Sequence, residues 1–279
     1  MADFPIGVIL DSFRKPFEEA LDIAASLGVQ GIQVYATQGE MSPEALTGEK
    51  RKHFLRMVKD RGLVISALCG DLGHGFGDFA KNAGLIAKSK AILDLAKDLE
   101  TDIVTTHIGV VPADAGHPRY GVMLDACGEL AAYADSLNAH FAIETGPEPA
   151  ATLKAFLDNL HSTGVAVNLD PANLVMVTGD DPVRAVHTLK DYIVHTHAKD
   201  GVKFYDRDPE KIYGLVADDA LVTDASFEEV PLGEGHVPFP AYLAALAAIG
   251  YKGFLTIERE VGDDPVADIR RAVSFLRAI

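Results

Sequence analysis

Two histidines placed two residues apart are the residues of this sequence best suited to chemistry. They lie in Ile193-Val194-His195-Thr196-His197-Ala198-Lys199-Asp200, a segment whose apolar start and polar end are typical of a short strand leaving a core. Because side chains alternate along a strand, His195 and His197 share one face. Imidazoles at a strand tip can reach a metal or a substrate. We expect His197 to reach such a site, and His195, one layer deeper, to be a buried histidine with satisfied hydrogen bonds.

Three further segments that are predicted to be strands each end in an acid. They are Phe141–Glu144, Val165–Asp170 and Phe254–Glu258. In the last two, aliphatic residues alternate with small or polar ones, which suits barrel strands covered on the outside by helices. The acid is the last inward residue each time. Because the carboxyl ends of barrel strands share one rim, we expect convergence there of Glu144, Asp170, His197 and Glu258.

This set of four suits one divalent cation. Two glutamates, an aspartate and a neutral imidazole form a mixed oxygen and nitrogen shell that fits Mn²⁺, Mg²⁺ or Co²⁺, with Zn²⁺ as a further option. Three carboxylates in one pocket would repel one another strongly without a cation. The alternative is that each acid caps a helix or makes a salt bridge at the rim, above all Asp170, because Pro171 follows it. For a single acid that alternative is the better one, whereas four strand-end residues together favour a metal.

The composition excludes several classes of protein. The chain has 279 residues, of which 48% are hydrophobic, and 25 basic residues against 41 acidic ones give a net charge of −16. This charge repels phosphodiester backbones, so nucleic acid is not an expected partner. Cys69 and Cys127 are too few for a disulfide framework and fit a reducing compartment. The sequence shows neither a basic N-terminal region nor a run of about 18 apolar residues, so we expect a soluble cytoplasmic protein that does not enter a membrane.

Strand and helix patterns alternate eight times along the chain. Such alternation predicts the α/β class, and eight units in one run favour a closed barrel. An open dinucleotide-binding sheet would need a glycine-rich turn after its first strand, and Asp11-Ser12-Phe13-Arg14 is not one. We therefore predict a single (β/α)8 TIM barrel over residues 1–279. We also expect a helix from about Pro43 to Arg61, and a long polar loop at about 201–237 without a clear helix, which suits a lid or an oligomer contact.

Four other residues are candidates for substrate contact. His107 ends the predicted fourth strand and can reach the same rim, with a histidine hydrogen-bonded inside the barrel as an equal alternative. Lys199, close behind the histidine pair, can hold a substrate oxygen; the alternative is a solvated loop lysine. His74 lies among glycines in a loop that can bring it over the pocket, and a surface histidine is the alternative. Asn173 follows Asp170 by three residues and is expected to line the pocket.

At these residues the sequence resembles the xylose isomerase-like (β/α)8 superfamily, and most closely its sugar phosphate isomerase/epimerase branch, with inosose isomerases and dehydratases and ketose 3-epimerases. The second half of the chain carries the resemblance, in the motifs Ala142-Ile143-Glu144-Thr145, Asn168-Leu169-Asp170-Pro171-Ala172-Asn173, His195-Thr196-His197-Ala198-Lys199-Asp200, Leu232-Gly233-Glu234-Gly235, and Gly250-Tyr251-Lys252-Gly253 before Thr256-Ile257-Glu258-Arg259. It implies that the four strand-end residues are metal ligands, and that Glu144 and Glu258 are also the acid/base pair of an epimerase. Asn173 departs from the pattern, because many epimerases and the related DNA-repair endonucleases have a histidine there. The departure weakens the case for a multinuclear zinc site.

These observations predict a metal-dependent isomerase or epimerase that moves a proton next to a carbonyl of a sugar, sugar phosphate or cyclitol. The expected cofactor is one divalent metal, manganese first, with magnesium, cobalt or zinc as alternatives. A dehydratase, lyase or hydrolase on a related keto-sugar is the nearest alternative, and an endonuclease-type phosphodiesterase is disfavoured by Asn173 and by the acidic charge. A non-catalytic sugar-binding or metal-storing barrel is the alternative from a different class. The expected partner is a small-molecule sugar or cyclitol, and homo-oligomer formation is left open.

Overall fold

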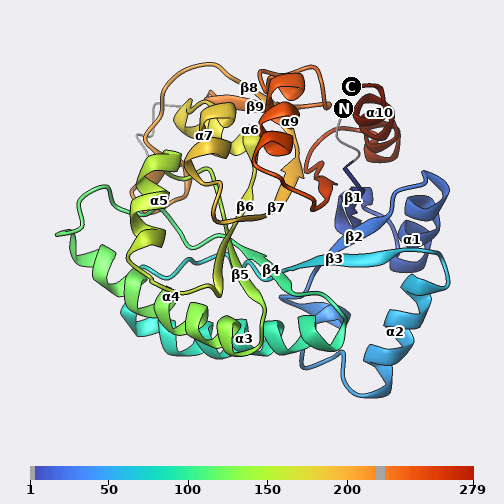
Figure 1. Cartoon of the computed structure of the whole chain (residues 1–279), viewed down its shortest axis with the longest axis horizontal. Helices are drawn as coiled ribbons and strands as arrows, with labels where there is room; N and C mark the ends of the chain where they lie inside the picture. Colours follow the sequence, from blue (N-terminus) through green and yellow to red (C-terminus); the bar gives the residue numbers. More distant parts are fainter. Residues whose placement is uncertain (1–3, 218–223) are drawn as a thin grey trace.

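The computed structural model describes residues 4–217 and 224–279. Within them, eight parallel strands close into a barrel in the order β1-β10-β7-β6-β5-β4-β3-β2 (Figure 1). The strands are β1 Ile6–Ile9, β2 Gly31–Tyr35, β3 Val64–Cys69, β4 Ile103–Thr106, β5 His140–Glu144, β6 Val165–Leu169, β7 Ile193–Ala198 and β10 Leu255–Ile257. The first and last strands pair in parallel, with Val8 opposite Ile257, and this pairing closes the barrel. The predicted fold class, a single (β/α)8 barrel, is confirmed.

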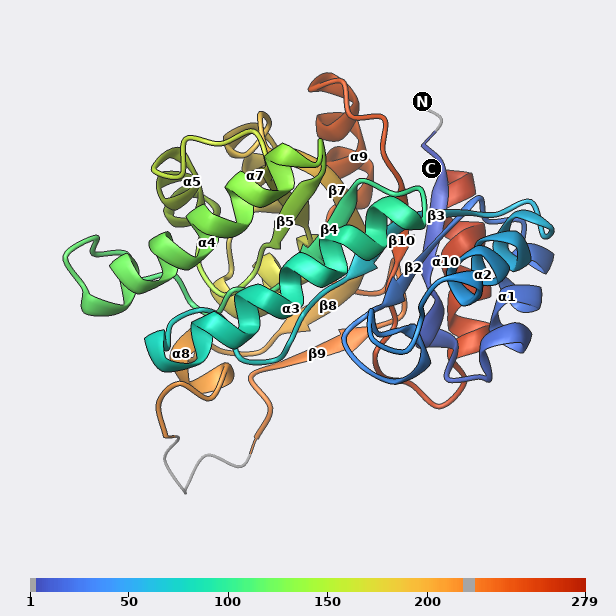
Figure 2. The same cartoon turned by 90° about the horizontal axis from the view of Figure 1, so that it is seen from below.

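Helices wrap the outside of the barrel, as Figures 1 and 2 show from two directions. The main helices are α1 Phe17–Ser26, α2 Glu49–Lys59, α3 Phe79–Asp98, α4 Pro118–Ser136, α5 Ala150–Asp158, α7 Pro182–Thr188, α9 Phe239–Ala248 and α10 Pro265–Ala278. Shorter turns are η1 Leu10–Phe13, η2 Gly39–Met41, α6 Pro171–Asn173, η3 Leu174–Thr178 and α8 Pro209–Ile212. Several of the helices begin with an acidic cap followed by a proline. The carboxylate accepts the free backbone N–H groups of the first turn, and the proline has no N–H group that would need a partner. Asp181 caps α7 and Asp264 caps α10 in this way.

The core between barrel and helices follows from the alternation along each strand. In β6, Val165, Val167 and Leu169 belong to the buried apolar cluster. Asn168, between them, instead bonds Glu144 in the barrel interior. A period of two thus turns one side of the strand to the helices and the other to the polar interior.

One predicted helix begins later than expected. α2 begins at Glu49 rather than near Pro43. Gly48 has a φ of 50°, in the left-handed region, and separates the helix from a turn in which the N–H groups of Ala45 and Leu46 bond the Ser42 carbonyl. Glycine adopts this backbone conformation at little cost, so it ends the pattern that helical periodicity alone would continue.

The segment 201–237 is not a bare polar loop in its described part. β8 Asp200–Lys203 pairs antiparallel with β9 Phe227–Val230, and the short helix α8 lies between them in sequence. Figure 2 shows these three elements together at one end of the barrel. The Asp200 carboxylate fastens the segment by accepting, at 2.9–3.1 Å, the backbone N–H groups of Gly201, Gly233, Gly235 and Val237. Residues 218–223 of the predicted loop lie outside the described residues, and a lid or oligomer contact stays a prediction.

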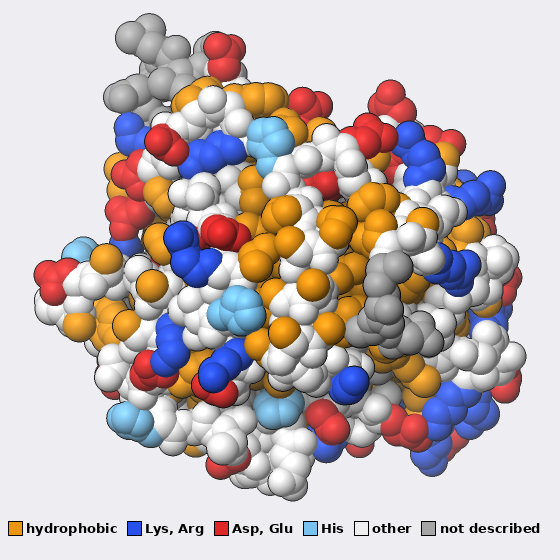
Figure 3. Space-filling model, turned by 45° about the horizontal axis from the view of Figure 1, so that its top comes forward, with side chains coloured by type: hydrophobic (Ala, Val, Ile, Leu, Met, Phe, Trp, Pro, Cys, Tyr) orange, Lys and Arg blue, Asp and Glu red, His pale blue; other side chains and the backbone are white. Residues whose placement is uncertain are grey.

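The surface carries mixed charge. On the face in Figure 3, basic and acidic side chains are interspersed around a central group of hydrophobic ones. Across residues 4–217 and 224–279, no helix has both the length and the apolar character that a bilayer span requires.

Candidate active site

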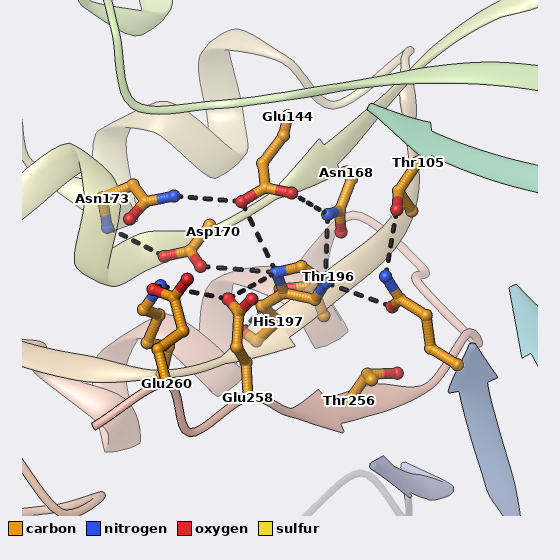
Figure 4. A network of polar contacts seen from close by, with 12 residues as sticks. Thr105, Glu144, Asn168, Asp170, Asn173, Thr196, His197, Thr256, Glu258 and Glu260 are labelled. Atoms are coloured by element: carbon orange, nitrogen blue, oxygen red, sulfur yellow. Dashed lines mark hydrogen bonds and ion pairs between the residues drawn. The ribbon is translucent and has the colours of Figure 1, made fainter. Parts of the chain in front are cut away.

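Four side chains from four strand ends meet inside one rim of the barrel (Figure 4). Glu144 ends β5, His197 lies in β7, and Asp170 and Glu258 directly follow β6 and β10. One ligand atom from each lies within 4.8 Å of every other. His197 Nδ1 lies 3.1 Å from Glu258 Oε2, 3.4 Å from Asp170 Oδ2 and 3.7 Å from Glu144 Oε1. The structure thus brings together the residues that the sequence analysis grouped, and their role as ligands stays a prediction.

The facing atoms of this cluster are buried and lack hydrogen bonds. Among the residues that the structure describes, His197 Nδ1, Asp170 Oδ2 and Glu258 Oε2 have no hydrogen-bond partner, although Glu258 Oε2 has Lys199 Nζ as an ionic neighbour at 3.2 Å. Buried polar atoms are normally satisfied, so three such atoms side by side need a reason. Opposite ligands of one divalent cation lie about 4–5 Å apart, since each bond is about 2.0–2.6 Å long. The span of 4.8 Å therefore fits one divalent cation.

Gln33 decides which nitrogen of His197 faces the carboxylates. This glutamine of β2 is fully buried, and its Oε1 lies 3.1 Å from His197 Nε2. Its amide nitrogen donates to Thr105 Oγ1 at 3.0 Å, which leaves Oε1 as the atom facing the imidazole. Burial alone lowers the pKa of His197, but the carboxylates around it raise that pKa well above its usual value. A cation at the cluster would displace the hydrogen on Nδ1, while Nε2 keeps its hydrogen toward Gln33. A histidine that binds a metal commonly donates its other N–H in this way.

Two asparagine amides orient Glu144. Asn168 Nδ2 donates to its Oε2 and Asn173 Nδ2 to its Oε1, both at 3.0 Å. Asn168 Oδ1 in turn accepts from His195 Nδ1 at 2.9 Å, and His195 Nε2 accepts from Thr256 Oγ1 at 2.9 Å. His195 is therefore the satisfied core histidine that was predicted, and burial lowers its pKa to about 3. Asn173 lines the site cavity, and its amide nitrogen bonds Glu144. Its role as a substrate contact stays a prediction.

The two oxygens of Asp170 do different things. Oδ1 accepts the backbone N–H of Asn173 at 2.8 Å and so caps α6, whose first residue is Pro171. Oδ2 faces His197 and carries no hydrogen bond. Burial raises the pKa of this carboxyl. The capping alternative and the ligand hypothesis thus apply to different atoms of one side chain.

Lys199 is a buried neighbour of Glu258, and the alternative of a solvated loop lysine is wrong. Its side chain is 4% exposed, and Nζ lies 3.2 Å from Glu258 Oε2. Glu260 and Glu229 are its further ionic partners. Burial opposes ionisation of Glu258, but the ammonium of Lys199 and the ring of His197 hold its pKa at about 2. Glu258 is therefore a carboxylate at neutral pH.

A cavity of about 560 Å³ opens onto the cluster, and its lining includes His107, Asn173 and Lys199. His107 Nε2 lies 3.4 Å from Glu144 Oε1. Burial alone lowers the pKa of His107, but the carboxylate of Glu144 outweighs burial and raises it to about 9. His74 is exposed and does not contribute to this cavity lining, so its role as a substrate contact stays a prediction without support from its position.

Sequence reasoning misses three residues of the site. Gln33 and Asn168 are single polar residues inside otherwise apolar strands, and that pattern is a usable signal. Tyr213 follows α8 and lines the same cavity, with its ring centroid 6.0 Å from that of His107. It comes from the long 201–237 segment, where no periodicity marks a residue that turns inward.

The barrel and its strand-end residues match a known family. The family profile described as xylose isomerase-like TIM barrel matches residues 21–279. The chain belongs to this family. A search of curated proteins found no match to the sequence.

Solved structures include several xylose isomerase-like barrels that cover nearly the whole chain. A xylose isomerase domain protein from Planctomyces limnophilus is 26% identical, with a TM-score of 0.80 over 99% of this chain and 96% of that one. The probable 3-DHS dehydratase AsbF from Bacillus anthracis is 19% identical, with a TM-score of 0.76 over 98% and 99% of the two chains. The 3-keto-D-glucoside 4-epimerase YcjR from E. coli is 16% identical, with a TM-score of 0.74 over 99% and 100%. The last two likenesses establish the shared fold.

Proposed function

We propose that this xylose isomerase-like barrel is a divalent-metal-dependent isomerase or epimerase that moves a proton next to the carbonyl of a sugar, sugar phosphate or cyclitol. The supporting observation is the buried cluster whose facing atoms lack hydrogen bonds. The residues that would hold the cation are Glu144, Asp170, His197 and Glu258. Mn²⁺ is the first choice for this donor set, with Mg²⁺, Co²⁺ or Zn²⁺ as alternatives. A bound cation would polarise the substrate oxygens next to it.

Glu144 and Glu258 are the proposed acid/base pair. They come from β5 and the end of β10, which are not neighbours in the barrel, so a substrate bound over the cluster would meet a carboxylate from two sides. Lys199 keeps Glu258 ionised, and two amides hold Glu144 in one orientation. A carboxylate that is ionised and fixed can remove or return a proton at carbon with little reorganisation. His107, beside Glu144, can donate a hydrogen bond to a substrate oxygen.

Loss of water is the nearest alternative outcome of the same proton removal. A protein named as a dehydratase shares the fold. Expulsion of a hydroxyl needs a proton donor near the leaving oxygen, and the cavity lining offers His107 and Lys199 for that role. A phosphodiesterase of the endonuclease type has less support, since Asn173 uses its amide to hold Glu144 and offers no imidazole to a second metal.

The test is hydrogen exchange at carbon during turnover in D₂O with Mn²⁺, on a panel of ketoses, keto-glucosides and inososes. We expect solvent deuterium in the product. Glu258→Gln and Glu144→Gln should each lower the rate by at least about 10²–10⁴, because each loses a positioned proton-transfer group. Glu234→Gln, at an exposed glutamate, is the matched control and should leave the rate unchanged.

Two outcomes would contradict the proposal. One is turnover by Glu258→Gln near the wild-type rate. The other is a product that carries no solvent deuterium under any condition. A product lighter than its substrate by one water would identify the dehydratase alternative instead.

A further inference from the structure

A second cavity, of about 750 Å³, opens on the side of the barrel that carries α1 and α2. Its walls come from the start of α1, from the connection between β2 and α2, and from α2 itself. The proposed proton transfer makes no use of it. Its apolar lining consists of Phe17, Met41, Ala45, Leu46, Phe54 and Met57.

This second cavity has the chemistry of a site for an apolar group. The rings of Phe17 and Phe54 lie 5.0 Å apart at 47° and form an aromatic wall. Asp11, Glu18, Gln38, Glu40, Lys50 and His53 add polar and charged groups to the lining. Sites for small organic molecules combine an apolar wall of this kind with polar groups that fix the orientation of the ligand.

Tyr35, at the end of β2, contributes to the lining of both cavities. Its backbone N–H donates to Asp11 Oδ2 at 3.3 Å. This hydrogen bond connects the end of β2 to η1, the turn that follows β1. Its hydroxyl makes no hydrogen bond within the described part of the chain. Burial raises the pKa of the phenol, so the hydroxyl stays protonated and available as a donor. The two cavities are therefore neighbours that share one half-buried tyrosine.

The combined size exceeds what a simple sugar needs. Small-molecule sites generally measure about 300–1,000 Å³. The cavity of about 560 Å³ at the four strand-end residues is therefore sufficient for a hexose by itself. The second cavity next to it offers room for the part of a substrate that extends beyond the sugar ring.

We propose that the substrate is a keto-glycoside with an aromatic or other apolar aglycone, whose sugar ring binds at the metal cluster and whose aglycone fills the cavity beyond Tyr35. This inference rests on the proposed function, and it names the substrate class of the same site. Tyr35 would lie beside the glycosidic linkage, with its hydroxyl free to donate to an oxygen there.

Two glycosides that differ only in the aglycone test the inference. The probes are phenyl and methyl 3-keto-β-D-glucopyranoside, and binding is measured by calorimetry on the Mn²⁺-loaded full chain. Burial of the phenyl ring should make the phenyl glycoside bind about tenfold more tightly or better. Ala45→Trp, which fills the cavity from a half-buried position, should abolish that preference and leave methyl glycoside binding unchanged. Met57→Gln, which makes the lining polar, should reduce the preference without adding bulk, and Ala244→Trp, at an exposed site on α9, should behave as wild type.

Several results would overturn the inference. These are equal binding of the two glycosides by the wild type, equal weakening of both by Ala45→Trp and Met57→Gln, or no binding of either glycoside. Sedimentation that changes from dimer to monomer on Ala45→Trp would assign the cavity to a second copy of the chain instead. Hydrogen exchange in D₂O separates this inference from the proposed function. A phenyl preference that Ala45→Trp abolishes, without any exchange at carbon, would support the cavity and refute the chemistry. If both glycosides bound with equal affinity and both exchanged hydrogen at carbon, the result would support the proposed chemistry and refute the role of the second cavity.

Discussion

Replacing Gln33 by methionine removes the acceptor that orients His197 while nearly conserving side-chain length. In the wild type, Gln33 Oε1 lies 3.1 Å from His197 Nε2. Nε2 also lies 3.2 Å from Asn168 Nδ2, an amide donor. Without the glutamine, that amide can donate to a bare Nε2, and the imidazole hydrogen then moves to Nδ1. In that tautomer Nδ1 presents a hydrogen to the carboxylate cluster and cannot bind a cation.

The expected loss follows from the role of such outer partners. Removing the hydrogen-bond partner of a metal-binding histidine typically costs about 10- to 100-fold in metal affinity. This corresponds to about 1.4–2.7 kcal/mol of binding free energy. Gln33→Glu keeps an acceptor toward Nε2 and should retain most of the affinity. Thr105→Val leaves Gln33 in place but frees its amide to rotate, so its loss should be smaller than that of Gln33→Met.

Titration calorimetry of metal-stripped protein with Mn²⁺ at fixed pH measures these affinities. Urea denaturation with and without Mn²⁺ gives an independent reading, because a ligand that binds only the native state stabilises it according to its concentration and affinity. If Gln33→Met bound Mn²⁺ as tightly as the wild type and gained the same stability from it, His197 would not bind a cation through Nδ1, and the proposed ligand set would be wrong.

Three further predictions concern the metal count, pH and the 201–237 segment. Elemental analysis should find one divalent metal per chain, and two or three would revive the phosphodiesterase alternative. Burial raises the pKa of Glu148 from 4.5 to about 8, so between these values the unfolded chain loses a proton that the native protein keeps, and stability falls as pH rises. Glu148→Gln should remove this slope, so that its free energy of unfolding in urea exceeds that of the wild type by up to a few kcal/mol as the pH rises from about 5 to about 8. If the free energies of unfolding of the two proteins changed in parallel with pH, this result would refute the argument. Asp200→Asn turns one acceptor oxygen into a donor facing two backbone N–H groups, so it should cost about 2–5 kcal/mol of unfolding free energy. Asp206→Asn, at a side chain that is 97% exposed, is the control. Equal stability of the two variants would contradict the proposal that the Asp200 carboxylate holds the 201–237 segment in place.

The grouping of the four strand-end residues could be predicted because parallel topology converts position along a strand into position in space. Each of Glu144, Asp170, His197 and Glu258 stands at or just after the last inward position of its strand, and closure of the barrel brings those positions together. The fate of His195 could be predicted for the same reason, because two residues along a strand correspond to one deeper layer. The cytoplasmic location and homo-oligomer formation depend on no such rule and stay predictions.

The rest of the site depends on side-chain orientation and on irregular backbone, which periodicity does not describe. Gln33 acts on a histidine 164 residues away, and the contact exists only because β2 faces β7 across the barrel interior. Lys199 has Glu229 as one of its ionic partners, and the pairing of β9 with β8 brings Glu229 into place. This two-stranded sheet forms where the sequence analysis expected a long polar loop without a clear helix. The late start of α2 depends on the backbone angle of Gly48.

The charges around the cluster give a reason for one cation rather than several. Glu144, Asp170 and Glu258 bring three negative charges into a buried site, and the ammonium of Lys199, 3.2 Å from Glu258, returns one positive charge. Around them, the carboxylates of Glu229 and Glu260 are offset by Arg259, which pairs with Glu229, and by His107, whose pKa is raised to about 9. One divalent cation beside a neutral His197 would therefore bring the site to zero. A second divalent cation would leave two uncompensated positive charges, each of which costs several kcal/mol in a buried site unless further anions accompany it. Asn173 stands where an additional imidazole would be needed, and its amide nitrogen instead donates a hydrogen bond to Glu144. Asn173→His would therefore not create a second site by itself, since it adds a ligand but no negative charge, and elemental analysis of that variant should still find one metal per chain.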